Sequence, residues 1–110
     1  MNKIQPYHHG NLKKELIEKA IAIVNNEGEQ ALSIRKVAGA CGVTYAAPYA
    51  HFKNKEELLL ACREYVSIQF ADYLLNSITD KNPANPETLI VLGNAYIEFF
   101  KLHSAYYNFI

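Results

Sequence analysis

The chain has 110 residues, of which 50% are apolar and 20% are charged, and its 11 basic side chains balance its 11 acidic ones. This composition excludes a disordered protein, because disordered chains combine low hydrophobicity with high net charge. It also excludes a fibrous protein, since the sequence has no internal repeat and no low-complexity segment. We expect one globular domain, or a piece of one, with a core of modest size.

The apolar runs and the cysteines predict an intracellular, reduced protein. The longest apolar runs, residues 21–24 and 58–62, are far shorter than the roughly 18 residues that a membrane-spanning helix requires. No secretory segment opens the chain, so we expect a cytoplasmic protein with no membrane partner. Cys41 and Cys62 form no CxxC pair and lie among apolar neighbours, which predicts reduced structural thiols rather than a disulfide or a zinc site.

The zero net charge hides an asymmetry between the two halves. Residues 1–55 carry eight Lys or Arg against four Glu, giving +4, whereas residues 56–110 carry three against seven acidic residues, giving −4. This pattern indicates an anionic partner that meets only the first half. The alternative is a chance partition of surface charge.

Apolar residues recur with helical spacing between residues 12 and 24, which predicts a first helix. Asn11 is suited to cap its N-terminus, and Gly28 is placed as a left-handed C-terminal cap. Strand-like alternation of apolar and polar residues occurs nowhere in the sequence. The pattern therefore favours an all-α protein from its first element onward.

Two short helices are expected next. Ser33 is suited to cap a helix that runs over residues 34–40, and residues 41–43 form a turn. Thr44 is then suited to cap a third helix over residues 44–50. These two short helices precede the longest helical pattern in the chain.

A long fourth helix is expected to begin after Asn54, where Glu57 completes a capping box, and to continue to about residue 78. The stretch from residue 80 to residue 86 is rich in turn-forming residues and marks the clearest break in the chain. Pro86 then suits the first position of a fifth helix that Asn85 caps and that ends near residue 103. A further short helix is expected to begin at Ser104.

The informative stretch is residues 33–58. Ala38, Gly42 and Val43 have the spacing that two crossing helices need: a small residue at the approach, a glycine for positive φ, and an apolar residue that fills the gap. Lys55 lies at the N-terminal end of the expected fourth helix, where a cation faces the positive end of the helix dipole. A bound phosphate would remove that conflict.

At these residues the sequence resembles the TetR/AcrR family of one-component bacterial repressors. The resemblance rests on residues 33–44, on the run Tyr-Ala-His-Phe at residues 49–52, and on Lys55 and Leu58. The opening Tyr-His-His-Gly-Asn-Leu at residues 7–12 resembles one subgroup of that family. Together these motifs cover about residues 7–60.

The resemblance implies an all-α fold in two parts. Residues 1–54 would form a three-helix, helix-turn-helix DNA-binding domain, and residues 55–110 a connecting helix followed by the start of an incomplete helical domain for ligand binding and dimerisation. Family members usually run to about twice this length, so we expect the chain to be a fragment. Their homodimers form through C-terminal helices that this chain lacks.

The resemblance also assigns roles to single residues. Phosphate contacts are implied for Ser33, Thr44, Tyr49, His51 and Lys55. Base-edge contacts are implied for Tyr45, Ala46, Ala47 and Pro48. None of these four can make a bidentate base contact, so we expect recognition by the tyrosine hydroxyl and by apolar contact with thymine methyl groups, and Arg35 is a candidate reader of guanine. Ala50 stands where relatives often carry Arg or Lys, which predicts weaker non-specific affinity.

The aromatic stretch after Pro86 resembles the first helices of the family's ligand-binding domain. Tyr96, Phe100 and His103 are therefore candidates for contact with an unknown small-molecule effector. For His103, packing inside the protein or exposure at the surface is the alternative. No cofactor or metal is expected, because the His and Cys residues show no spacing suited to ligating one.

The sequence thus predicts a ligand-responsive transcriptional repressor that binds a pseudo-palindromic, double-stranded DNA operator. No nucleophile elbow, Gly-rich phosphate loop or carboxylate pair is present, so no enzyme is expected. The alternative is a helical protein-interaction module without DNA binding. Independently of that choice, we expect Phe52 to be a core aromatic. A core aromatic is the alternative for Tyr49, and a structural histidine is the alternative for His51.

Overall fold

The computed structural model describes residues 10–109, and this part of the chain contains helices and no strands. The α-helices are α1 (Leu12–Glu27), α2 (Ile34–Cys41), α3 (Lys55–Ser77) and α4 (Pro86–Leu102). The 3-10 helices are η1 (Glu29–Ala31), η2 (Ala47–Ala50) and η3 (Ser104–Phe109). The all-α prediction is confirmed, whereas Tyr7, His8 and His9 lie outside the described residues. Within residues 10–109 no helix is long and apolar enough to cross a membrane.

Helix α1 forms because its apolar residues recur along one face, and six of its residues are buried there. Asn11 occupies the N-cap position, where its carbonyl accepts a hydrogen bond from the Glu15 amide at 3.1 Å, although its side chain caps nothing. Gly28 ends the helix with φ +91° and donates its amide to the Val24 carbonyl. Its ψ of 159° lies outside the left-handed helical region that the sequence predicts, in a region open to glycine.

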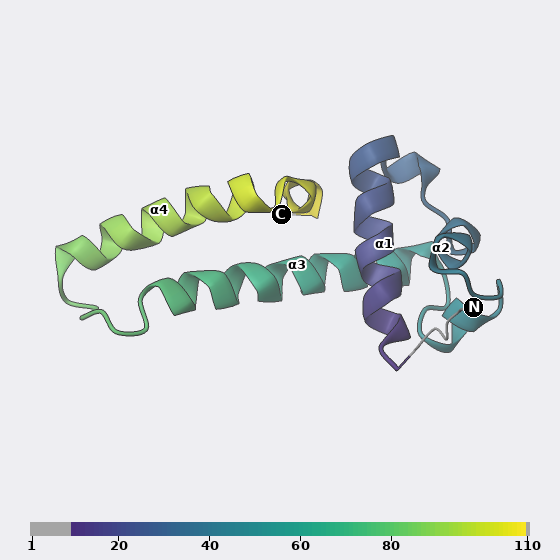
Figure 1. Ribbon diagram of the computed structural model, residues 1–110, viewed down its shortest axis with the longest axis horizontal. Helices are drawn as coiled ribbons and strands as arrows, with labels where there is room; N and C mark the ends of the chain where they lie inside the picture. Colours follow the sequence, from purple (N-terminus) through teal and green to yellow (C-terminus); the bar gives the residue numbers. More distant parts are fainter. Residues whose placement is uncertain (1–9, 110) are drawn as a thin grey trace, which may run out of the picture.

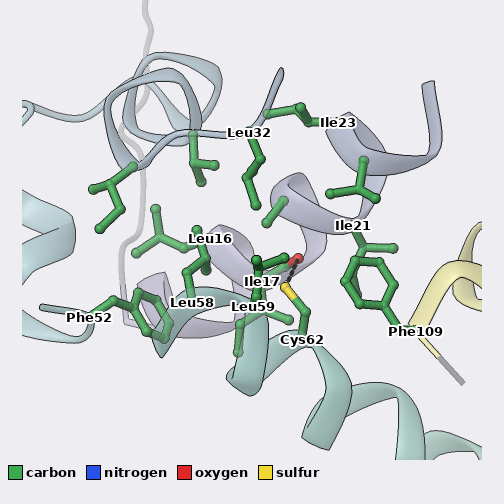
Figure 2. Packing of buried hydrophobic residues seen from close by; sticks show 14 of the residues in the cluster. Leu16, Ile17, Ile21, Ile23, Leu32, Phe52, Leu58, Leu59, Cys62 and Phe109 are labelled. Atoms are coloured by element: carbon green, nitrogen blue, oxygen red, sulfur yellow. Dashed lines mark hydrogen bonds between the residues drawn. The ribbon is translucent and has the colours of Figure 1, made fainter. Parts of the chain in front are cut away.

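The N-terminal core lies where α1 crosses the start of α3, with α2 packed against α1 (Figures 1 and 2). Leu16, Val37, Leu58 and Val66 are each almost fully buried in it. Phe109, near the other end of the chain, belongs to the same cluster and lies beside Ile21 in Figure 2. The core of the first half is therefore closed partly by the last element of the chain.

The third predicted helix is wrong in type and extent. Residues 45–46 form a turn, and only Ala47–Ala50 are helical, as the 3-10 helix η2, with no side-chain cap from Thr44. Pro48 explains the difference, because it lacks the amide that an α-helical turn would need and its ring is fully buried. Its carbonyl accepts hydrogen bonds from the amides of His51 and Phe52, both at 2.9 Å, which closes the tight turn.

Helices α3 and α4 form a long antiparallel hairpin (Figure 1). The Asn54 side chain accepts from the Glu57 amide at 2.9 Å, and the Asn85 side chain caps α4 by accepting from the Glu87 amide. Glu57 reaches back as predicted, but its carboxylate accepts from the Lys53 amide at 2.8 Å rather than from that of Asn54. At about 1.5 Å per residue, α3 is about 35 Å long and links the N-terminal core to the hairpin tip.

Aromatic rings fill the space between α3 and α4. The Phe70 ring of α3 lies 5.2 Å from that of Phe99 and 5.4 Å from that of Phe100, measured between centroids. Tyr73 contacts Phe99 at 5.5 Å and donates its hydroxyl to the Glu98 carboxylate. These contacts hold α3 against the C-terminal half of α4. Helix η3 follows this part of α4 and packs beside α1.

Candidate nucleic-acid interface

The turn between α2 and η2 has the geometry that the sequence predicts for a helix-turn-helix. Gly42 adopts the left-handed conformation at φ +71°, and the Val43 amide donates to the Ala38 carbonyl at 3.1 Å, six residues back counting both ends. This pattern is the Schellman motif, which favours glycine at the left-handed position. Ala38 is fully buried and Val43 packs on the core, as predicted.

Most of the residues predicted to contact DNA lie on the exposed surface of this unit, within residues 33–55. Exposed among them are Ser33, Arg35, Thr44, Tyr45, Ala46, Tyr49 and His51. Ala47 and Lys55 are half-buried. The base contact predicted for Pro48 is wrong, because its ring is fully buried in the core and offers no surface to a base. The turn formed by η2 points its proline inward, so the neighbouring positions face outward.

Two tyrosines stand out from this surface. Tyr45 is 53% exposed and Tyr49 is 56% exposed, whereas Phe52 on the same segment is 3% exposed. Core packing therefore accounts for Phe52, as predicted, but it does not account for either tyrosine. An exposed tyrosine carries an apolar ring and a hydroxyl that both donates and accepts, which suits contact with a polar polymer.

Residues 30–55 carry four cations and no carboxylate: Arg35, Lys36, Lys53 and Lys55. Lys36 pairs with the Glu27 carboxylate of α1. Arg35 and Lys55 form no ion pair with a carboxylate of residues 10–109. They thus keep their charge available on the exposed surface, which favours an anionic partner there.

Ser33 combines a structural role with a free donor. Its Oγ accepts a hydrogen bond from the Lys36 amide at 3.0 Å and so caps α2, as predicted. The hydroxyl proton remains able to donate outward, since a hydroxyl both accepts and donates. A phosphate oxygen near the start of α2 would meet this donor.

The charges at the N-terminus of α3 are less unfavourable to the helix dipole than Lys55 alone suggests. Glu56 and Glu57 also lie in its first turn, and the Glu57 carboxylate already accepts from a backbone amide there. These two carboxylates offset the unfavourable placement of Lys55 against the helix dipole. The helix dipole therefore adds little to the case for a phosphate, and that case rests on the exposed donors of the face.

The predicted effector residues are brought together only in part. An open hollow of about 630 Å³ on α4 and η3 is lined by Tyr96, Ile97, Phe100, Lys101 and Tyr107. His103 lies elsewhere: its ring stacks on that of Tyr106, with centroids 4.9 Å apart and planes 9° apart, and also contacts Phe99. Packing, one of the two alternatives for His103, is what the structure shows.

Several contacts were missed by the sequence interpretation. Ile97, Lys101 and Tyr107 also line the hollow. Ile97 and Lys101 directly follow the predicted Tyr96 and Phe100 on the same helix, which could have indicated them. No spacing could indicate that Phe109 enters the core beside α1, because its neighbours lie far earlier in the chain. Equally hidden was the contact between Arg35 and Tyr45, which come from opposite sides of the turn.

Both cysteines are free and buried, as predicted. Burial raises the pKa of the Cys62 thiol to about 12, and the Cys62 thiol lies 3.8 Å from the Ile17 carbonyl oxygen. Burial also raises the pKa of Cys41. Neither thiol is set up as a nucleophile, because reactivity requires the thiolate.

An all-helical bundle that holds a helix-turn-helix with a polar, basic outer face is the architecture of a DNA-binding regulator. Residues 16–62 match the family described as bacterial regulatory proteins, tetR family. The chain is 43% identical to the HTH-type transcriptional regulator YerO of Bacillus subtilis over 56 residues, which cover 50% of this chain and 19% of YerO. It is 38% identical over 61 residues to the transposon Tn10 TetC protein of Escherichia coli, covering 56% of this chain and 31% of TetC.

The fold extends this likeness beyond the matched segment. The fatty acid degradation regulator FadR of Bacillus halodurans superposes with a TM-score of 0.77 over 91% of this chain, at 22% identity, and the match spans 52% of FadR. The segment of residues 16–62 belongs to the TetR family of bacterial regulatory proteins. The chain spans less than half of the two curated relatives named above and about half of this solved structure.

Proposed function

We propose that this protein is a ligand-responsive transcriptional repressor that binds a pseudo-palindromic DNA operator as a homodimer in the cytoplasm. The observation that carries the proposal is the exposed face of residues 33–55, which combines hydroxyl and cationic donors and lacks any carboxylate up to Glu56. The family match of residues 16–62 supports DNA as the partner of this face. We propose residues 1–54 as the DNA-binding part and residues 55–110 as the start of the regulatory part.

Phosphate contacts would position the protein on the duplex. The exposed side chains of Thr44, Tyr49 and His51 and the ammonium of Lys55 flank the turn, and Ser33 offers a hydroxyl at the start of α2. Such contacts fix register and orientation without reading sequence. They also release counterions, so affinity should fall steeply as salt rises.

Base contacts would come from the turn and from η2. Tyr45 can offer its hydroxyl to a base edge, and the exposed Ala46 and half-buried Ala47 can contact thymine methyl groups. Pro48 takes no part, since it is buried. This set predicts a site in which thymine methyl groups contribute measurably to affinity.

An effector would act at the hollow lined by Tyr96 and Phe100. Its aromatic lining continues through the Phe99 ring, which lies 5.9 Å from that of Tyr106 in η3, between centroids. The same short element inserts Phe109 into the core beside α1. This continuous packing supports a ligand response, because a shift of η3 would move side chains that hold the DNA-binding core.

Homodimerisation follows from the form of the proposed operator. Two recognition elements must lie one helical turn of DNA apart, roughly 34 Å, to meet successive major grooves. The relatives have segments beyond the matched length, and we propose that equivalent C-terminal helices set this spacing.

Fluorescence anisotropy with a labelled DNA duplex, repeated over a range of salt concentrations, tests the proposal. Wild-type protein should bind with an affinity that falls linearly with salt on logarithmic axes. Lys55→Ala should weaken binding to every sequence about equally and lower the slope by about 0.9, the value for one phosphate contact. Lys81→Ala is the matched control, because Lys81 pairs with Asp80 in the loop at the hairpin tip, and it should leave the slope unchanged.

A protein-interaction module without DNA binding is the second candidate. The exposed apolar side chains of α4, with Leu89 73% exposed and Ile90 64% exposed, favour it. Absence of salt-dependent binding to any duplex, together with equal behaviour of the two lysine variants, would support this second function and overturn the first.

A further inference from the structure

Arg35 and Tyr45 lie against each other across the turn. Arg35 comes from the first turn of α2 and Tyr45 from the segment before η2, and the guanidinium carbon of Arg35 lies 4.4 Å from the centroid of the Tyr45 ring. This distance is within the range of a cation–π contact. Both side chains are exposed on the face that we propose meets DNA.

The contact with Tyr45 engages the guanidinium through its central carbon, which lies over the ring. The five N–H donors of arginine point outward in the plane of the guanidinium, so a contact of this kind leaves them able to donate. Within residues 10–109, no carboxylate forms an ion pair with Arg35, although its neighbour Lys36 is paired with Glu27. Arg35 thus presents an oriented, unpaired fork of donors.

The residues that follow the turn contain no side chain that can make a bidentate contact with a base. Residues 44–48 are Thr, Tyr, Ala, Ala and Pro, so none of them can donate two parallel hydrogen bonds to a base. Guanine presents two acceptors, O6 and N7, side by side in the major groove, and a guanidinium is the side chain that matches them. Arg35 is the guanidinium-bearing side chain of residues 1–55.

We propose that Tyr45 is a positioning residue that holds the Arg35 guanidinium for bidentate donation to one guanine in each half-site, so that the stacked pair reads a base as one unit. This inference rests on the proposed DNA-binding function and names the residues of the same surface that would determine its sequence preference. The ring of Tyr45 does the positioning, and its hydroxyl is not required for it. An exposed arginine without such support would have to be ordered by binding itself.

The test is selection of binding sites from a random duplex library by the wild-type protein and by variants. Arg35→Ala and Arg35→Lys remove the planar fork, Tyr45→Ala removes the ring, and Tyr45→Phe keeps the ring but removes the hydroxyl. Lys36→Ala is the matched control, because it deletes the adjacent cation, which is paired with Glu27. All these side chains are exposed, and circular dichroism melting checks that each variant folds.

We expect the wild-type protein to prefer guanine at one position of each half-site by about tenfold or more over other bases. Arg35→Ala and Arg35→Lys should lose this preference. Tyr45→Phe should keep it, and Tyr45→Ala should reduce it by about two- to fivefold, the strength of an exposed cation–π contact. Lys36→Ala should weaken binding but leave the preferred sequence unchanged.

Replacement of that guanine by 7-deazaguanine, which lacks the N7 acceptor, gives a readout that a merely structural role would not move. Wild type and Tyr45→Phe should lose affinity on this DNA, and Arg35→Ala should be indifferent to it. An unchanged guanine preference in Tyr45→Ala, or a guanine preference that survives in Arg35→Ala, would overturn the inference while the proposed function stands. Failure of the wild-type protein to enrich any sequence would overturn the sequence-reading part of the proposed function as well.

Discussion

Six of the 16 residues of α1 are buried, whereas three of the 17 residues of α4 are buried, although α4 has the more apolar sequence. Helix α1 is covered by α2, by the start of α3 and by η3, so its apolar face is enclosed. Helix α4 packs mainly against α3, so Leu89, Ile90 and Ile97 stay exposed. Apolar composition alone therefore does not measure how much a helix contributes to a core.

The two regions also differ in what their exposed side chains can do. The exposed face around η2 carries hydroxyl groups and unpaired cations, whereas the exposed face of α4 carries aliphatic and aromatic groups. The first face suits a charged polymer and the second suits apolar partners. The molecule thus combines an enclosed core that carries a polar contact face with a hairpin that exposes many apolar side chains.

Truncation of a core leucine should have the largest effect on this comparison. Leu16 of α1 is completely buried, so Leu16→Ala should lower the free energy of unfolding by about 2–5 kcal/mol. The same change at Leu89 of α4, which is 73% exposed, should alter it by no more than about 0.5 kcal/mol. Urea denaturation followed by circular dichroism measures both. Equal losses at the two sites would show that the exposed face of α4 is covered in solution.

Glycine substitutions should have opposite signs in the two regions. Gly42 has φ +71°, so Gly42→Ala should cost about 1–2 kcal/mol of stability, because a Cβ is strained in this conformation. Gly93 lies inside α4, and no atom lies within 4 Å of the position that a Cβ would take there. Gly93→Ala should therefore stabilise the protein by about 1 kcal/mol. Thermal melting of the two variants decides the matter, and a neutral Gly42→Ala would contradict the assigned turn.

The buried thiol predicts alkaline sensitivity of the N-terminal core. The pKa of Cys62 is raised by burial to about 12 in the folded protein from an ordinary value of 9.0. Above pH 9 the unfolded chain loses this proton while the folded chain keeps it, so stability falls as pH rises, by at most about 1.4 kcal/mol per pH unit from this group. Urea denaturation at pH 8.5 and pH 10 measures the fall. The Cys62→Ala variant should show a smaller one, and an identical pH dependence would rule out this group as the source.

A hydrogen bond between the two regions should have the smallest effect. The Tyr65 hydroxyl of α3 donates to the Glu18 carboxylate of α1 at 2.6 Å, and burial together with this bond raises the pKa of Tyr65. Tyr65→Phe should cost about 0.5–1.5 kcal/mol. Glu18→Gln, which keeps an acceptor, should cost less. A double-mutant cycle on urea denaturation isolates the coupling, and additive losses would mean that the bond contributes nothing.

Local patterns in the sequence predicted much of this fold. The side-chain caps at Ser33, Asn54 and Asn85 and the positive φ of Gly42 all follow from residue type and from neighbours within a few positions. Such features depend on hydrogen bonds that one turn of chain can satisfy. The bounds of the α-helices could be predicted to within about two residues for the same reason.

Features that depend on distant residues could not be predicted. The 3-10 turn at Ala47–Ala50 reflects the missing amide of Pro48 together with the burial of its ring against the core, and that burial could not be predicted from local spacing. The entry of Phe109 into the N-terminal core and the stacking of Arg35 on Tyr45 are contacts across the fold. These contacts depend on tertiary packing, and the periodicity of a sequence reports only local structure.

The central claim, that the face around the turn binds DNA, is tested most directly by backbone amide chemical shifts recorded while duplex DNA is added to the protein. The account predicts that the shifts change at residues 33–36 and 44–55 and stay constant along the exposed face of α4. Shift changes concentrated in residues 86–102 would contradict this claim. The absence of any shift change at low salt, even at the highest DNA concentration used, would also contradict it.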